Sequence, residues 1–322
     1  MKIFAPKFWN RLGIIPLLLM PFTFIYISVF YLRKILIKEH KFNLKVITIG
    51  NIDVGGSGKT PVAIYTASIL NKIEPNFCFL SKGYKGKACA PQLVSLSDDP
   101  SHVGDEPLLL AKYGRVVVAK NRQEGLKFCE SLGVAVVITD DGLQNPSFYK
   151  DLKIIVVDGN YGFGNYLPIP SGPMREFARF VLSASDMIIN LNAPPSAYLL
   201  HYKNKLINGK FLAQDNHNEG LFIAIAGIGR PEKFFNFLKD LSYHVVMQIK
   251  FPDHHPYNKD EILNLIEKAK NHSAKIITTE KDIVKIRNLI NDVLLNQYFV
   301  SLKITLKLEN ETSFNQKITS IF

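Results

Sequence analysis

A glycine-rich segment at residues 50–61, GNIDVGGSGKTP, here termed the phosphate loop, combines the residue types that bind phosphate groups. Its glycines let successive backbone N–H groups turn toward an anion, and the helix expected after them adds the positive end of its dipole. Lys59 would neutralise the β- and γ-phosphates of a nucleotide, and Thr60 would offer a hydroxyl group to Mg²⁺. The pattern G-x-x-x-x-G-K-[ST] is met except at its first glycine, where this chain has Asp53. The predicted nucleotide-binding residues are Val54, Gly55, Gly56, Ser57, Gly58, Lys59, Thr60 and Pro61.

Two adjacent carboxylates follow an apolar stretch and are candidates to bind the metal ion. The predicted strand 135–139 leads directly into Asp140 and Asp141. Neighbouring carboxylates repel each other unless a cation neutralises them, which favours this pair as ligands of Mg²⁺. Asp158, which follows the apolar run 154–157, is the competing candidate, and an exposed Asp-Asp-Gly turn is the purely structural alternative.

Short apolar runs alternate with helical stretches from residue 45 onward. Runs of nearly continuous valine and isoleucine are typical of a parallel sheet that helices cover on both faces. The fold class is therefore predicted to be α/β, with a doubly wound parallel sheet like that of P-loop NTPases. The predicted strands are 45–50, 77–80, 116–119, 135–139, 154–157 and 187–190, and the predicted helices are 60–72, 107–112 and 124–132.

A second, smaller α/β lobe is predicted after a proline-rich segment at 192–196 and a polar segment at 203–218. Within it, Asn258 and Glu261 form a capping-box-like pair at the start of a helix, and Thr279 is predicted to cap another helix. Its predicted strands are 221–226, 244–249 and 275–278, and a helix is predicted over 231–241. We place the boundary near residue 215, which gives a membrane anchor (1–40), a core that carries the phosphate loop (41–215) and a C-terminal lobe (216–322).

Residues 14–32 form an uncharged apolar stretch whose length suits a membrane. A helix over these residues would extend roughly 28 Å, close to the roughly 30 Å of the hydrocarbon core. Pro16 and Pro21 disfavour a straight spanning helix, so the segment either spans the membrane or lies in its interface. A cleaved signal peptide and a buried core helix are the alternatives. The basic residues that follow the stretch predict that the rest of the chain is cytoplasmic: Arg33, Lys34, Lys38, Lys41 and Lys45.

The composition excludes several classes of protein. Hydrophobic residues make up 47% of the 322 residues, so the chain is not disordered as a whole. The three cysteines lack C-x-x-C spacing, which excludes a disulfide scaffold and a cysteine-rich zinc module. The net charge of +11 favours an anionic partner, but no basic motif with interleaved aromatic residues supports nucleic acid.

Further motifs resemble one family, the tetraacyldisaccharide 4'-kinases of lipid A biosynthesis. The resemblance implies transfer of the γ-phosphate of ATP, with Mg²⁺, to the 4'-hydroxyl of an acylated glucosamine disaccharide 1-phosphate. It places this reaction at the cytoplasmic face of the bacterial inner membrane and implies neither nucleic acid nor an obligate protein partner. The matching motifs, in family order, are VGGSGKTP (54–61), SKGY (81–84), VGDEP (103–107), DDGLQN (140–145), GFGN (162–165), PSGPMRE (170–176), AGIGRPEKFF (226–235), FPDHHPY (251–257) and TTEKD (278–282).

The resemblance also implies roles for individual residues. Asp105 and His254 match an acid–base pair that would orient the sugar hydroxyl and accept its proton. His255 is adjacent to His254, and the sequence leaves open which of the two histidines pairs with Asp105. The alternative role of Asp105 is that of a helix cap. The resemblance adds Glu176 to the predicted metal ligands Thr60, Asp140 and Asp141. The implied substrate-binding residues are Gln144, Asn145, Asn165 and Arg175, of which the arginine would bind phosphate.

Two positions depart from the family pattern. Asn145 stands where the family usually has histidine, so an acid–base role there is doubtful. Lys82 stands where the family usually has arginine, which keeps the charge but loses bidentate phosphate geometry. A GTPase switch and a transport or assembly ATPase are the competing functions for the same phosphate loop. The sequence lacks the N-K-x-D motif that a guanine site requires.

Overall fold

The larger of two β-sheets has nine strands in the order β13-β8-β7-β6-β1-β5-β2-β4-β3 among the residues that the structure describes. The structure is a computed structural model, and it describes residues 6–214 and 218–322. Neighbouring strands are parallel except at the two edges, where β13 and β3 run antiparallel to their partners. The strands are β1 (Lys45–Gly50), β2 (Phe77–Ser81), β3 (Gln92–Leu93), β4 (Arg115–Val118), β5 (Val136–Asp140), β6 (Leu152–Asp158), β7 (Met187–Leu191), β8 (Leu206–Ala213) and β13 (Ile304–Leu308).

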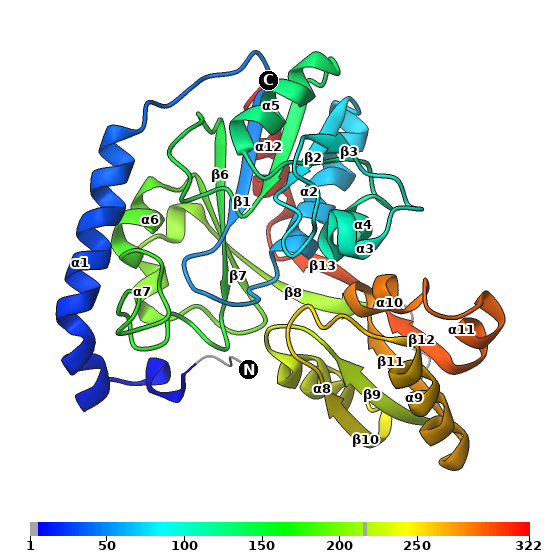
Figure 1. Cartoon of the computed structure of the whole chain (residues 1–322). Helices are drawn as coiled ribbons and strands as arrows, with labels where there is room; N and C mark the ends of the chain where they lie inside the picture. Colours follow the sequence, from blue (N-terminus) through cyan, green and yellow to red (C-terminus); the bar gives the residue numbers. More distant parts are fainter. Residues whose placement is uncertain (1–5, 215–217) are drawn as a thin grey trace.

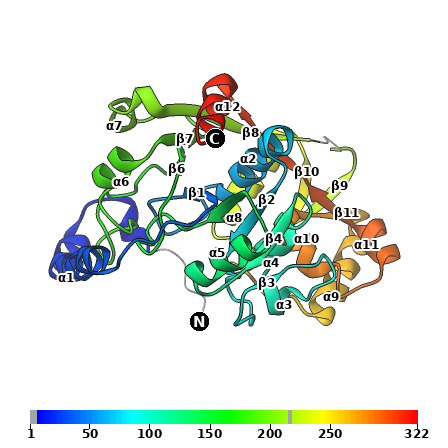
Figure 2. The ribbon, with the colours of Figure 1, turned by 90° about the horizontal axis from the view of Figure 1, so that it is seen from above.

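Helices cover both faces of this sheet (Figures 1 and 2). On one face, α2 (Lys59–Ile73) and α12 (Glu311–Thr319) pack against alternate side chains of the central strands. On the other face lie α5 (Arg122–Ser131) and α6 (Ala178–Ala184). Strands β2, β5 and β7 are buried along their whole length, which explains their uninterrupted apolar sequences. The predicted α/β class with a doubly wound parallel sheet is confirmed.

The second sheet is parallel throughout and has the order β10-β9-β11-β12. Helix α8 packs on one face, and α9 and α11 pack on the other. The Asn258–Glu261 capping box is present at the start of α9, and Thr279 caps α10, as predicted. The elements are β9 (Leu221–Ala226), α8 (Pro231–Asp240), β10 (His244–Lys250), α9 (Lys259–Asn271), β11 (Ala274–Thr279), α10 (Glu280–Ile286), α11 (Asp292–Tyr298) and β12 (Phe299–Leu302).

The chain crosses between the two sheets twice. Strand β8 lies in the segment 203–218 that the sequence marks as polar, and it was not among the predicted strands. Strand β13 pairs antiparallel with β8, so residues from Ile304 onward belong to the first sheet although the predicted division assigns 216–322 to the second lobe. The strand pattern of β8 is weak because most of its side chains are only half-buried. The predicted boundary at residue 215 lies outside the described residues.

The apolar N-terminal segment forms α1 (Ile14–Leu36), which lies along the outer side of the first lobe (Figures 1 and 2). Its mean hydropathy is 2.0, and its length and composition are sufficient to cross a membrane. Only 11% of its most apolar window is buried, so α1 is not a core helix. Its inner face is fixed by the Thr23 hydroxyl, 2.7 Å from the Ser171 hydroxyl, and by the Tyr26 hydroxyl, which donates to the Arg175 carbonyl at 2.9 Å.

Candidate active site

The candidate site lies where the carboxyl ends of β1, β5 and β6 face the second lobe (Figure 1). Ligands of open parallel sheets bind at this edge because the strand-to-helix loops converge there. The phosphate loop follows β1, the acidic doublet ends β5, and Asp158 ends β6. From the other side, loops and helix α10 of the second lobe reach the same edge, and α10 packs against α4 (Asp105–Leu110).

The phosphate loop turns sharply into α2, with Gly58 in the left-handed region at φ 94°. The side chain of Asn51 organises the loop, since its Nδ2 donates to the Asp53 carbonyl at 2.8 Å and to the Gly55 carbonyl at 3.1 Å. The Lys59 ammonium donates to Asn51 Oδ1 at 3.1 Å and lies 3.8 Å from Asp141 Oδ1. Lys59 is therefore held at the carboxyl edge of the sheet, where it meets the acidic doublet.

The two carboxylates of the doublet have different partners. Asp141 adopts a left-handed backbone with φ 53°, and its Oδ1 accepts from Arg175 at 2.7 Å. Burial raises the pKa of Asp141, but the charges of Lys59 and Arg175 outweigh it and bring the pKa below its usual value. Asp140, by contrast, has a buried Oδ1 with no hydrogen-bond partner among the described residues. Burial, followed by the nearby charge of Glu106, raises the pKa of Asp140 to about 7.

Glu106, which sequence reasoning missed, joins the phosphate loop to the second lobe. Its Oε1 accepts from the Thr60 hydroxyl at 3.3 Å and from the Lys281 ammonium of α10 at 3.0 Å. Burial raises the pKa of Glu106, and the charge of Lys281 more than offsets this and lowers it. Glu106 lies in the GDEP motif and Lys281 in the TEKD motif. These motifs carried the resemblance to the family, but they did not predict that the two side chains contact each other.

Asp105 and His254 are 149 residues apart in the chain and are in direct contact. Nδ1 of His254 lies 2.8 Å and 2.9 Å from the two oxygens of Asp105. Because a carboxylate only accepts hydrogen bonds, Nδ1 carries a proton and donates it to Asp105. Nε2 of His254 lies 3.4 Å from the Lys281 ammonium, a group that only donates, which leaves Nε2 as an acceptor.

The charge of Asp105 is stabilised despite its burial. Burial raises its pKa, but the hydrogen bond from His254 and the charges of Lys281 and Lys285 outweigh it and lower the pKa to about 2. Asp105 is the first residue of α4 and its N-cap is Gly104, so the predicted alternative of Asp105 as the helix cap is wrong. One oxygen of Asp105 also accepts from the backbone N–H of Glu106 at 2.9 Å. His255, the other candidate, points elsewhere: its Nε2 lies 3.1 Å from Glu261 of the capping box.

The remaining predicted site residues separate into two groups. Arg175 and Gln144 lie beside the doublet: Arg175 also donates to Gln144 Oε1 at 3.3 Å. Asn145 Oδ1 accepts from the Ser147 N–H within its own turn, and the Asn165 amide donates to the Ser171 carbonyl at 2.8 Å. These two asparagines therefore hold loops in place, and no described contact turns either of them toward the phosphate loop.

Glu176 faces helix α1. Its carboxylate lies 3.7 Å from the Lys34 ammonium of α1, and burial raises its pKa. Within residues 6–214 and 218–322, no three acidic, histidine or cysteine side chains form a cluster that could hold a metal ion. Asp140, Asp141 and Glu176 therefore do not form such a cluster in this part of the chain, and their joint role as metal ligands stays a prediction.

A smaller donor set suits Mg²⁺, which usually takes one or two carboxylates and completes its octahedron with water and phosphate oxygens. The free buried oxygen of Asp140 and the hydroxyl of Thr60 are both at the carboxyl edge, and both interact with Glu106. A cation at this point would satisfy the orphaned oxygen and relieve the repulsion between Asp140 and Glu106. The residues present thus fit a magnesium ion.

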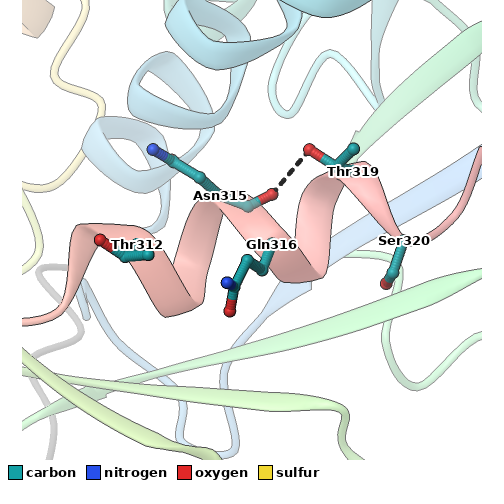
Figure 3. A pocket seen from close by; sticks show the side chains of 5 residues that line it. All are labelled: Thr312, Asn315, Gln316, Thr319 and Ser320. Carbon is teal, nitrogen blue, oxygen red and sulfur yellow. Dashed lines mark hydrogen bonds between the residues drawn. The ribbon is translucent and has the colours of Figure 1, made fainter.

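A surface hollow of about 420 Å³ lies elsewhere, along α12 (Figure 3). Only uncharged polar side chains line it, and the Thr319 hydroxyl donates to the Asn315 carbonyl within the helix. It offers no acid, base or cation for phosphoryl transfer. The chemistry of this chain therefore lies at the sheet edge and not in this hollow.

Comparison with known proteins agrees with this geometry. The family model for tetraacyldisaccharide-1-P 4'-kinase matches residues 15–322. The chain belongs to this family. It is 38% identical to a tetraacyldisaccharide 4'-kinase from Rickettsia canadensis, across 98% of this chain and 97% of that protein. It is 36% identical to the protein of the same name from Rickettsia akari, with the same share of this chain covered.

A solved structure supports the same conclusion. The crystal structure of LpxK from Aquifex aeolicus in complex with ATP superimposes with a TM-score of 0.73 and 26% identity, over 96% of this chain and all of that one. The predicted family and fold, and with them a kinase activity that uses ATP, are confirmed. The predicted GTPase and transport-ATPase alternatives receive no support from these relatives.

Proposed function

We propose that this chain transfers the γ-phosphate of ATP to the 4'-hydroxyl of an acylated glucosamine disaccharide 1-phosphate, at the cytoplasmic face of the inner membrane. The observation that carries the assignment of the site is the Asp105–His254 pair, which the second lobe completes beside the phosphate loop. Lys281 and Glu106 connect this pair to Thr60 of the loop through contacts of 3.4, 3.0 and 3.3 Å. The nucleotide and the acceptor hydroxyl would thus meet within one connected set of side chains.

In this mechanism Lys59 and the backbone N–H groups of the phosphate loop bind the phosphates of ATP. Thr60 and Asp140 would hold Mg²⁺, which when bound neutralises charge on the phosphate oxygens. Nε2 of His254 accepts the proton of the sugar hydroxyl, while Asp105 holds the proton on Nδ1 and stabilises the charge that the ring acquires. Arg175, which is paired with Asp141, and Gln144 remain the proposed contacts to the acceptor.

The membrane helix supports the choice of a lipid acceptor. The outward side chains of α1 include large apolar residues with more than half of their surface exposed, among them Leu18, Phe22 and Ile25. The inner face of α1 contacts the backbone of Arg175 through Tyr26, and Lys34 lies near Glu176. A residue proposed to contact the acceptor is therefore attached directly to the element proposed to enter the membrane, which would confine the site to the plane of its substrate.

One assay tests this proposal. The full chain is incubated with labelled ATP, Mg²⁺ and the acylated disaccharide 1-phosphate, and the lipid fraction is examined for label. We expect labelled lipid with the wild-type chain, and kcat reduced by about 10²–10⁴-fold in Asp105→Ala, the usual contribution of a general base or its partner. Label that is released only as inorganic phosphate, or an unchanged kcat in Asp105→Ala, would contradict the proposal.

A further inference from the structure

The second lobe places two basic side chains directly on the phosphate loop. Arg230 precedes α8 and donates to Asp53 Oδ2 at 2.8 Å and to Asp158 Oδ2 at 3.3 Å. Lys233, on the first turn of α8, donates to the carbonyl of Gly56 at 2.8 Å and pairs with Asp158. The contacts of Arg230 with Asp53 and of Lys233 with Gly56 join residues 177 positions apart. All of these contacts are separate from the Asp105–His254 pair.

The position of Arg230 is closely defined. Its guanidinium carbon lies over the Tyr161 ring, 3.5 Å from the ring centre, while its two Nη atoms donate to Asp53 and Asp158. A Cβ atom at Gly55 would lie 2.8 Å from Arg230 Nη2, and one at Gly229 would lie 3.6 Å from the backbone nitrogen of Gly56. The arginine therefore touches the glycine backbone that is expected to surround phosphate.

The partners of Arg230 are unusual for a structural ion pair. Asp53 replaces the first glycine of the phosphate-loop pattern, and only 8% of its side-chain surface is exposed. Asp158 is exposed by 2%, and its Oδ1 has no hydrogen-bond partner in the described part of the chain. The Ser57 hydroxyl within the loop is likewise buried without a partner. The ion-paired cluster of Arg230, Asp53 and Asp158 thus lies next to buried polar atoms that have no partner, at the place where the phosphates of a nucleotide would bind.

We propose that Arg230, assisted by Lys233, is a phosphate-binding arginine that the second lobe supplies to ATP, and that Asp53 and Asp158 hold it when nucleotide is absent. The inference rests on the proposed nucleotide site in the phosphate loop. The guanidinium group of arginine can donate to two phosphate oxygens at once. Phosphate oxygens are anionic acceptors like the oxygens of Asp53 and Asp158, so phosphate can replace these carboxylates as the partner of Arg230. Binding of ATP then requires Arg230 to exchange its carboxylate partners for phosphate oxygens.

The exchange makes two predictions of opposite sign. Arg230→Gln removes the phosphate ligand, and we expect kcat to fall by about 10²–10³-fold, the usual effect of removing one donor to a developing charge. Arg230→Lys should restore only part of this loss, because lysine keeps the charge without the fork. Asp53→Asn removes the competing carboxylate, and ATP should then bind about tenfold more tightly, the worth of one charge-assisted hydrogen bond. A gain of affinity cannot result from misfolding.

The experiment measures ATP affinity by titration calorimetry and kcat with the acylated acceptor, for the full chain and each variant. Lys250→Gln is the matched control, since it removes a positive charge that pairs with Glu232 on the exposed side of the same lobe. The double variant Asp53→Asn/Arg230→Gln should lose the gained affinity. An unchanged kcat in Arg230→Gln, or an unchanged ATP affinity in Asp53→Asn, overturns the proposal. Lys59→Ala, measured in parallel, tests the nucleotide site itself. If the phosphate loop does not bind ATP at all, Lys59→Ala binds ATP like the wild type. If only the role of Arg230 is wrong, Lys59→Ala still loses ATP affinity.

Discussion

Replacing Asp105 with asparagine tests how strongly the acid–base pair holds the two lobes together. Asp105 begins α4 of the first lobe, whereas His254 and Lys285 belong to the second. The carboxylate is 5% exposed, accepts from His254 at 2.8 Å and lies 3.8 Å from the Lys285 ammonium. Asparagine has nearly the same shape but no charge, so the variant isolates the electrostatic contribution of this contact.

The size of the effect follows from the pKa of Asp105, which is 3.8 without its partners and about 2 in the folded chain. One pKa unit corresponds to about 1.4 kcal/mol, so the ionised carboxylate contributes about 2 kcal/mol to the free energy of unfolding. Because the folded pKa lies below the unfolded one, the contribution is complete above about pH 4. It is lost as the pH falls from 4 through 2, where the carboxylate becomes protonated in the folded chain as well.

Urea unfolding followed by circular dichroism measures this contribution. At pH 7 and pH 5 we expect Asp105→Asn to be about 2 kcal/mol less stable than the wild type, and at lower pH the difference should shrink toward zero. The matched control is Asp240→Asn, which alters an exposed aspartate at the end of α8. A difference that stays constant between pH 5 and pH 2.5, or no difference at pH 7, would refute the reasoning.

Three further predictions concern the site and the membrane. In steady-state kinetics, His254→Gln should lower kcat by roughly 10²–10⁴-fold, because His254 is the histidine that pairs with Asp105. His255→Gln should keep kcat within a few-fold. In thermal unfolding it should lower the melting temperature, since His255 contacts the capping box of α9. Equal losses of kcat in both variants would show that the pairing with Asp105 does not select the base. Lys59→Ala should abolish saturable ATP binding in titration calorimetry, because the variant removes the cation beside the glycine backbone. Changing the exposed Leu18 and Ile25 of α1 to aspartate should release the chain from sedimenting anionic vesicles without altering the inner face of the helix; full sedimentation of this variant would place the membrane contact elsewhere.

The local features of the chain could be predicted because their causes lie within a few residues. The glycines before Lys59 predict the sharp loop, and Gly58 does adopt a left-handed backbone. The apolar runs predict the central strands, since a strand buried on both faces needs an apolar side chain at nearly every position. The cap of α9 was predicted from Asn258 and Glu261, which are three positions apart and contact each other.

Contacts between distant segments could not be predicted in this way. Strand β8 has mostly half-buried side chains, so its alternation is weak, and its pairing with β13 joins residues about ninety positions apart, such as Ala213 and Ile304. At the site, the contacts of Glu106 could not be predicted from the sequence for the same reason. Its neighbour Asp105 was singled out by a motif, but the contacts of Glu106 with Thr60 and Lys281 exist only because α4 lies between the phosphate loop and α10.

The amino-acid sequence by itself determined the phosphate loop, the α/β class, the apolar helix and the family, since each depends on residue types at short spacing. The tertiary structure decided which of two adjacent histidines meets Asp105. His254 lies in the left-handed region at φ 54°, which turns its ring toward the first lobe, while His255 contacts Glu261. It also decided that Asp140 keeps a free oxygen while Asp141 is paired with Arg175. Adjacent residues are equivalent in a motif, and only the packing of the two lobes gives them different partners.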